Sequence, residues 1–331
     1  MVRAGGFMES ARSVLSYRES GVLVALVAIT GAMFVISPTF RDPYNLTIIL
    51  IQMSVIAIMA MGQTLVIISG AFDLSQGPVS GLVAMVTGMM WSIFGADPAV
   101  AITAGIATGA ACGLANGVLA ARFKLHPIVM TLATSTIFTG LNYFITRGRP
   151  VIGLPDPLLE PGAGNVGPVP TPVVIMLVVT IVMQFLLTRT LFGLRVRQVG
   201  GNLEAARRTG VNVSATWLAV FVISGILSAI GGIVELGRVG NAIPSIGLTL
   251  LFPIISSAII GGTLLTGGSG SMVGTLLGAA TLTVINNALV VLQVDIYVQD
   301  VFQGALVVVA LVIDQFRRRE LTVRDLIRSD L

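Results

Sequence analysis

The side chains that most often carry out catalysis or bind metals are nearly missing from this sequence, which has one His and one Cys. These are His126 and Cys112, and the single Lys is Lys124. Clustered His/Cys metal sites, Cys–His catalysis and internal disulfides all need more such residues, so they are excluded. Lys124 does not end a G-x-x-x-x-G-K-[ST] motif, which excludes a P-loop. We therefore expect a chain that is not an enzyme and holds no metal or cofactor of its own.

A second kind of chemistry is indicated by polar residues between and within apolar stretches. Asp73 and Ser75 lie in a glycine-rich break at 69–77, with no Lys or Arg nearby. A carboxylate near hydrocarbon is costly and usually has a purpose. One interpretation is that Asp73 or Ser75 caps the following helix. The other is that the break lines a polar cavity, as broken helices do in transporters.

Amide side chains inside apolar stretches add to this set. Interhelical hydrogen bonding is their ordinary role, but amides also suit sugar hydroxyls, which need donors and acceptors without charge. Among these amides, the pair Asn286–Asn287 is the strongest candidate for lining a pathway. The candidate pathway residues are Asp73, Ser75, Asn116, Asn286 and Asn287. Glu235 and Arg238, three residues apart, are interpreted as a local ion pair.

The composition predicts that membrane-spanning helices position these residues. The chain is 55% hydrophobic and 10% charged, against about 25% charged residues in soluble domains. A bilayer core of about 30 Å needs about 20 helical residues. The sequence has ten apolar stretches near that length: 20–37, 46–70, 76–95, 98–121, 126–146, 170–188, 214–236, 249–267, 270–292 and 296–315. We expect an all-α, polytopic membrane protein with about ten transmembrane helices.

The distribution of basic residues predicts the orientation. With the N-terminus inside, four of the 19 Lys and Arg residues fall outside, namely Arg41, Arg147, Arg149 and Arg238, and the other 15 fall inside. This is the bias of the positive-inside rule, so both termini are expected to be cytoplasmic. The domains are then a cytoplasmic segment 1–19, one transmembrane domain 20–315 and a cytoplasmic tail 316–331. The basic residues form no single patch, so no nucleic acid is expected.

Glycines recur at four-residue spacing in two stretches. Small residues at this spacing allow close approach of helix backbones. The sequence leaves two interpretations open: tight packing within the fold, or a seam between two copies of the chain. The two sets are Gly105, Gly109, Gly113 and Gly117, and Gly270, Gly274 and Gly278.

The basic loop 189–213 faces the cytoplasm in this topology and carries helix signals. Asn202 is a plausible N-cap, residues 203–208 favour a helix, and Gly210 is a stop signal. The segment is too polar to cross the membrane, so it predicts a short surface helix. The spans lack the acidic, His or Lys series of a proton- or sodium-driven carrier. This loop could therefore receive energy from a partner.

Three stretches resemble motifs of one family. Residues 67–77 (IISGAFDLSQG) are similar to its GGIDLSxGS segment, residues 199–210 (VGGNLEAARRTG) to its cytoplasmic xGGNxxAAxxxGI loop, and residues 260–271 (IGGTLLTGGSGS) to its GGTSLxGGxG segment. The chain thus resembles, over roughly 20–315, the permease subunit of bacterial monosaccharide ABC importers of the ribose, xylose, galactose and autoinducer-2 type. It departs at 250–257, where the family often has ELDAIAA, and at Ala71–Phe72, so the sugar stays open.

The resemblance implies a transporter complex in the inner membrane that translocates a monosaccharide or related polyol by alternating access. Two permease subunits, in a homo- or heterodimer, would form the pathway within the lipid. A separate cytoplasmic ABC ATPase would bind ATP and Mg²⁺, and an extracytoplasmic substrate-binding protein would deliver the sugar. Loop 189–213 would hold the coupling helix that docks on the ATPase. The contact residues expected there are Asn202, Glu204, Ala205, Ala206, Arg207 and Gly210.

Two alternatives remain. A branched-chain amino acid permease belongs to the same broad superfamily, but its zwitterionic substrate needs charged partners. A stand-alone secondary carrier or channel would transport without any ATPase.

Overall fold

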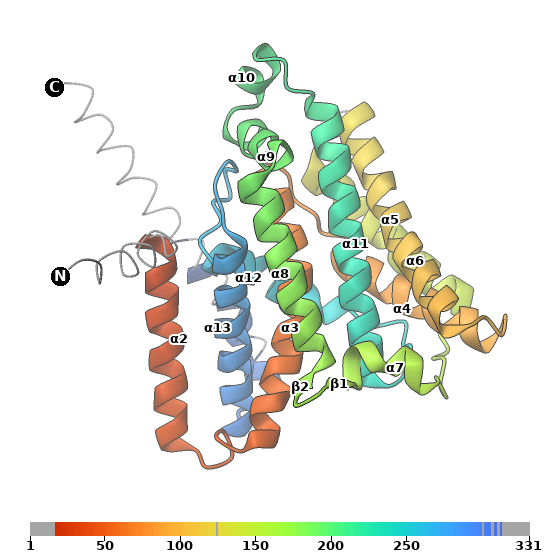
Figure 1. Ribbon diagram of the computed structural model, residues 1–331, viewed down its shortest axis with the longest axis vertical. Helices are drawn as coiled ribbons and strands as arrows, with labels where there is room; N and C mark the ends of the chain where they lie inside the picture. The colour runs from red at the N-terminus through yellow and green to blue at the C-terminus, as the bar shows by residue number, and fades with distance from the viewer. Residues whose placement is uncertain (1–16, 124, 300, 306–307, 310–311, 313–331) are drawn as a thin grey trace, which may run out of the picture.

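The computed structural model describes residues 17–123, 125–299, 301–305, 308–309 and 312, and this part of the chain is mostly helical (Figure 1). Its helices are α2 (Tyr17–Ile36), α3 (Pro43–Ile68), α4 (Gln76–Ser92), α5 (Pro98–Arg122), α6 (Pro127–Thr146), α7 (Asp156–Ala163), α8 (Thr171–Arg189), α9 (Leu191–Gly201), α10 (Leu203–Arg208), α11 (Val213–Val239), η1 (Leu248–Leu250), α12 (Leu251–Ile260) and α13 (Met272–Val291). Two short strands, β1 (Asn165–Val166) and β2 (Val169–Pro170), form an antiparallel hairpin.

Three of the long helices begin with a proline at the first helical position. Pro43, Pro98 and Pro127 start α3, α5 and α6. Proline lacks the N–H group that the first turn cannot use, so it fits there. Asp42 and Asp97 cap α3 and α5, because each side chain accepts a hydrogen bond from a backbone N–H of the first turn, at 2.8 Å in both cases.

Within the described residues, six helices are long and apolar enough to cross a membrane: α3, α5, α6, α8, α11 and α13. The segments Ser20–Ile36 and Leu248–Ile260 are apolar but shorter. Every predicted span from 20 to 292 contains a helix. Of the tenth, 296–299 and 301–305 are helical, and much of the rest lies outside the described residues. The predicted segments 1–19 and 316–331 lie outside them almost entirely.

The eighth predicted span, 249–267, is wrong in extent. Helix α12 ends at Ile260, and residues 261–271 form turns before α13. Gly262, Gly267 and Gly268 all adopt positive φ, between 77° and 88°, a conformation that other residues rarely accept. The apolar run therefore contains a half-length helix and a glycine-rich break.

Helix α3 is the centre of the bundle. Its most apolar window is 83% buried, against 28% for α5 and for α6, and it packs against α8, α11, α12 and α13. In Figure 1, α2 lies at one edge of the molecule and α6 near the other, while α9 and α10 project from one end and α7 and the hairpin close the opposite end.

The first glycine ladder is used inside the chain, where α5 packs against α11. A Cβ on Gly109 would lie 2.5 Å from the carbonyl oxygen of Gly225 and 2.6 Å from Cβ of Ala229. A Cβ on Gly113 would overlap the backbone of Phe221 and lie 3.0 Å from Cα of Val222. The packing interpretation of this ladder is therefore confirmed.

Candidate functional site

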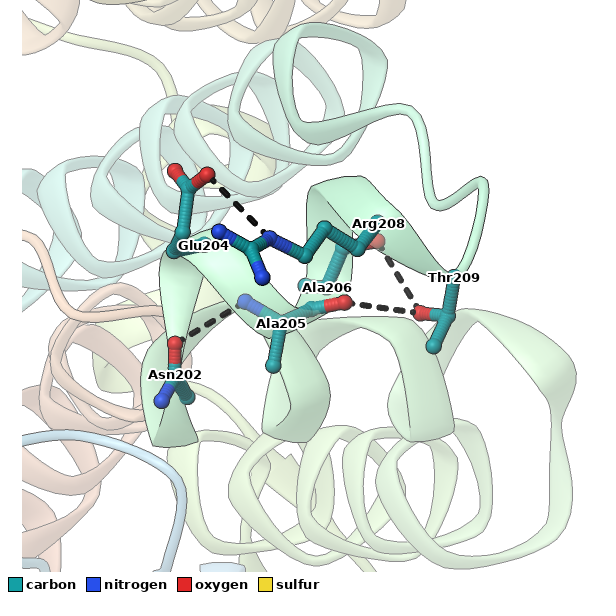
Figure 2. A network of polar contacts seen from close by, with 6 residues as sticks. All are labelled: Asn202, Glu204, Ala205, Ala206, Arg208 and Thr209. Carbon is teal, nitrogen blue, oxygen red and sulfur yellow. Dashed lines mark hydrogen bonds and ion pairs between the residues drawn. The ribbon is translucent and has the colours of Figure 1, made fainter.

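The segment between α8 and α11 folds into two short helices, α9 and α10, at one end of the molecule (Figure 1). The second, α10, is the helix that the sequence predicted after Asn202. Asn202 caps it, because its Oδ1 accepts a hydrogen bond from the N–H of Ala205 at 2.9 Å (Figure 2). Gly210 follows with φ of 82°, so the predicted stop is also observed. The preceding helix α9 was not predicted.

The surface of α10 is charged and open. Glu204 and Arg208 form an ion pair one turn apart, with Nε and Oε1 separated by 3.6 Å, and both side chains are mostly exposed (Figure 2). Thr209 closes the helix by donating to the carbonyl oxygens of Ala205 and Ala206, at 3.2 and 3.0 Å. The result is a compact, capped helix held out from the bundle.

The six residues expected to contact a partner divide into two groups. Ala206 is buried and packs with Val199 and Val213 in a small apolar cluster beneath the helix. It therefore anchors α10 to the helices on either side. The other five are exposed and free to meet a partner surface: Asn202, Glu204, Ala205, Arg207 and Gly210.

Backbone contacts between glycines join α9 to both breaks in the bundle. Gly268, in the break after α12, donates from its N–H to the carbonyl oxygen of Ile68 at the end of α3, at 2.8 Å. A Cβ on Gly200 of α9 would overlap that same carbonyl and lie 2.8 Å from N of Gly268. A Cβ on Gly70 would lie 3.4 Å from Cα of Gly200, and a Cβ on Gly267 would lie 3.0 Å from Cα of Gly70 and 2.7 Å from the carbonyl oxygen of Gly200. We call Gly70, Gly200, Gly267 and Gly268 the glycine junction.

The junction brings together the three stretches that the sequence singled out, 67–77, 199–210 and 260–271. Each contributes at least one glycine, and only hydrogen atoms separate the backbones there. Helix α9 therefore meets the end of α3 and the break after α12 through backbone atoms, without intervening side chains.

Three candidate pathway residues form one buried network. The carboxyl group of Asp73 accepts hydrogen bonds from N and Oγ of Ser75, at 2.9 and 2.6 Å, and from Oγ of Ser224 on α11, at 3.0 Å. Asn116 of α5 donates to Oγ of Ser75 at 2.7 Å, and Gln76 donates to Oγ of Ser224 at 2.8 Å. The network ties the α3–α4 break to α5 and α11.

The two interpretations of Asp73 can be compared with this geometry. Asp73 orders the turn before α4 by accepting from the N–H of Ser75, whereas Ser75 itself forms no side-chain cap. Asp73 is 2% exposed and Ser75 fully buried. A local structural role is thus visible, and a role in lining a pathway stays a prediction.

We expect Asp73→Ala to lower the stability of the protein by more than about 2 kcal/mol, because buried donors of Ser75 and Ser224 lose their acceptor. Asp73→Asn keeps one oxygen for Ser75 and should cost markedly less. Thermal unfolding of the purified protein in nanodiscs measures both. Equal losses for the two variants would show that the charge, rather than hydrogen bonding, holds the network.

The other two candidates, Asn286 and Asn287, are neighbours in sequence but face different surroundings. Asn287 forms a reciprocal amide pair with Asn45 of α3, with N–O distances of 2.8 and 3.0 Å, so it joins α13 to α3. Asn286 lines a cavity of about 220 Å³. The structure therefore does not bring these two residues together with Asp73, Ser75 and Asn116.

The cavity lies between α3, α11, α12, α13 and the helical segment after 296. Glu235 and Arg238 stand on its wall, joined by two hydrogen bonds of 2.7 and 2.6 Å, so the predicted ion pair is confirmed. Its other polar lining residues include Gln52, Thr249, Thr283, Asn286 and Gln303.

Sequence reasoning missed the partners that complete these sites. Ser224, Gln76 and Asn45 were not singled out, since nothing local marks a serine or an amide whose partner lies far along the chain. The glycines at 200, 267 and 268 were quoted within motifs, but only their close approach reveals their role.

A helical bundle interrupted by glycine-rich breaks, with buried polar networks, a polar cavity and an exposed charged helix at one end, is the arrangement expected of a membrane permease. The chain belongs to the family described as "Branched-chain amino acid transport system / permease component", whose model matches residues 45–311. It is thus a multi-pass membrane protein, and the family is one of permeases, as the prediction of a non-enzyme requires.

Several characterised permeases resemble it along nearly their whole length. The D-allose transport system permease protein AlsC of Escherichia coli is 36% identical, over 89% of this chain and 90% of that protein. The ribose import permease protein RbsC of Bacillus subtilis is 34% identical, over 90% and 93%. The autoinducer 2 import system permease protein LsrC of Photorhabdus laumondii is 30% identical, over 90% and 89%. No solved structure matches the chain.

Proposed function

We propose that this chain is the membrane-spanning subunit of an ATP-driven ABC importer that translocates a monosaccharide or related polyol by alternating access. The observation that carries the proposal is its 34–36% identity to the D-allose and ribose permeases over about nine tenths of the chain. The exposed, capped helix α10 supports it, because a rigid element at one end suits a partner that supplies energy.

A sugar is favoured over a branched-chain amino acid, although the family description names the latter. The relatives cited above are named for D-allose, ribose and autoinducer 2. An amino acid zwitterion also needs unpaired charges, and the buried carboxylate of Glu235 is already paired with the exposed Arg238. A stand-alone carrier is disfavoured because, in the part of the chain that the structure describes, the buried charged side chains Asp73 and Glu235 do not form a series.

The topology proposed is ten spans with both termini in the cytoplasm. It is supported by the distribution of Lys and Arg and by the position of α10 at the opposite end of the molecule from α7 (Figure 1). Loop 189–213 then faces the cytoplasmic ATPase, which binds ATP and Mg²⁺. The α7 end faces a substrate-binding protein, and a second permease subunit completes the pathway.

Within this assembly, α10 is proposed as the coupling helix. Asn202, Glu204, Ala205, Arg207 and Gly210 would meet the ATPase, and Ala206 would hold α10 against α9 and α11. The glycine junction would pass a movement of α9 to the breaks after α3 and α12. The pathway proposal keeps Asp73, Ser75, Asn116, Asn286 and Asn287, of which Asn286 alone lines the cavity.

Charge reversal on α10 tests the coupling role. Glu204→Arg should lower sugar uptake at least tenfold while the melting temperature hardly changes, because an exposed pair contributes only about 0.3–0.5 kcal/mol. The measurement is ATP-driven uptake in proteoliposomes together with co-purification of the ATPase.

The swap Glu204→Arg with Arg208→Glu is the matched control, since it restores the pair within the helix. If the ATPase recognises the charge at each of these positions, uptake by the double variant stays low. Recovery of uptake in the double variant would mean that α10 needs only its internal ion pair, and that the ATPase does not recognise which charge stands at each position.

The function itself is tested by reconstituting the chain with its cognate ABC ATPase and substrate-binding protein. Uptake of radiolabelled D-ribose or D-allose should require ATP and should not be competed by leucine. Uptake without the ATPase would favour a secondary carrier, and competition by leucine would favour an amino acid permease.

A further inference from the structure

We propose that the cavity lined by Gln52, Glu235, Arg238, Thr283, Asn286 and Gln303 is a binding site for one neutral polyhydroxylated molecule on its way through the membrane. The inference rests on the proposed function and adds to it the place where the permease itself holds its sugar.

The chemistry of the lining indicates the class of ligand. Nε and the terminal nitrogen of Arg238 both donate to the carboxylate of Glu235, so the two charges offset each other inside the cavity. What remains available is a set of amides and hydroxyls from Gln52, Thr283 and Asn286. Such groups both donate and accept hydrogen bonds, which matches hydroxyl groups of a sugar better than a free ammonium or carboxylate.

Size sets a second limit. A volume of about 220 Å³ corresponds to about seven water molecules at roughly 30 Å³ each. This gives room for one small polar molecule.

Thr283 supplies an independent observation. It is 1% exposed, lines the cavity, and its hydroxyl has no hydrogen-bond partner in the part of the chain that the structure describes. On the same helix, Thr275 and Thr281 donate to the carbonyl oxygen four residues earlier, at 3.0 and 2.8 Å. A buried hydroxyl without a partner is uncommon, and a rotation about χ1 would let a ligand or water in the cavity satisfy it.

The position of the cavity suits binding of the sugar after the substrate-binding protein has delivered it to the permease. Its wall includes the last turns of α11, which runs from the α10 end of the molecule towards α7 (Figure 1). It therefore lies in the half of the protein away from the coupling helix. In the proposed topology this half faces the substrate-binding protein.

Isosteric substitutions in the complete importer test the site. Thr283→Val should lower uptake of radiolabelled D-ribose and D-allose about fivefold, the value of roughly one hydrogen bond of 1 kcal/mol. Asn286→Leu and Gln52→Met, which keep the volume and remove the amide, should lower it further. Thr281→Val, two residues away and bonded within its own helix, is the control and should leave uptake within twofold.

Melting temperature and ATP hydrolysis stimulated by the loaded binding protein are measured alongside, and both should stay near wild type in Thr283→Val. If wild-type protein imports the sugars and all three cavity variants match it, the cavity proposal is wrong while the proposed function stands. If the wild-type importer takes up neither sugar, the proposed function fails and the cavity proposal fails with it.

Discussion

The substitution Gly113→Leu is expected to abolish the folded protein. A side chain at this position would overlap the carbonyl oxygen of Phe221 and crowd Cα of Val222, both backbone atoms of α11. Backbone within a packed helix cannot rotate away, so the cost should exceed the roughly 3 kcal/mol upper range of ordinary overpacking. Size-exclusion chromatography and thermal unfolding in detergent should show little or no monodisperse protein.

Gly31→Leu is the matched control for that experiment. Gly31 lies in α2, and a Cβ there would meet nothing within 4 Å. The variant should elute and melt like the wild type, because leucine is also a better helix former than glycine. A well-folded Gly113→Leu protein would show that α5 and α11 separate more easily than the structure implies.

The second large effect is expected for Gly200→Ala in the glycine junction. One methyl group there would overlap the carbonyl oxygen of Ile68 and lie 2.8 Å from N of Gly268. It would thus compete with the hydrogen bond that joins those two residues. ATP-driven uptake in proteoliposomes should fall at least tenfold, either because α9 is pushed away from the bundle or because the protein is lost.

The neighbouring Gly201→Ala separates these effects from a general effect of alanine. A Cβ at Gly201 would have only Cα of Gly268 nearby, at 4.0 Å, which is ordinary contact. Uptake by Gly201→Ala should stay within twofold of wild type. Equal activity of both variants would argue against a rigid junction.

Local signals in the sequence predict much of the helical pattern. The cap at Asn202 and the stop at Gly210 define α10 correctly, because both act through the backbone within a few residues. The prolines at 43, 98 and 127 mark helix starts for the same reason. These are properties of short segments, so no knowledge of the tertiary fold is needed.

Predictions that depend on distant contacts are weaker. The apolar run 249–267 predicted one span. Hydropathy depends only on side-chain polarity, so it does not detect the turns that Gly262, Gly267 and Gly268 make with positive φ. Asp73 was identified as unusual, but its partner Ser224 is 151 residues away. Asn286 and Asn287 were treated as one pair, whereas adjacent residues of a helix point in directions about 100° apart.

The central place of α3 has a consequence for biosynthesis. The helix is made early, but Thr64 reaches its hydroxyl partner only in Thr275, 211 residues later, and Asn45 reaches its amide partner only in Asn287, 242 residues later. Synthesis proceeds from the N-terminus, so α3 enters the bilayer long before α13 exists. Thr64 and Asn45 therefore gain these partners only after α13 has been made, whereas Thr47 and Ser54 bond within α3 itself, so the packing of α3 is completed late in synthesis.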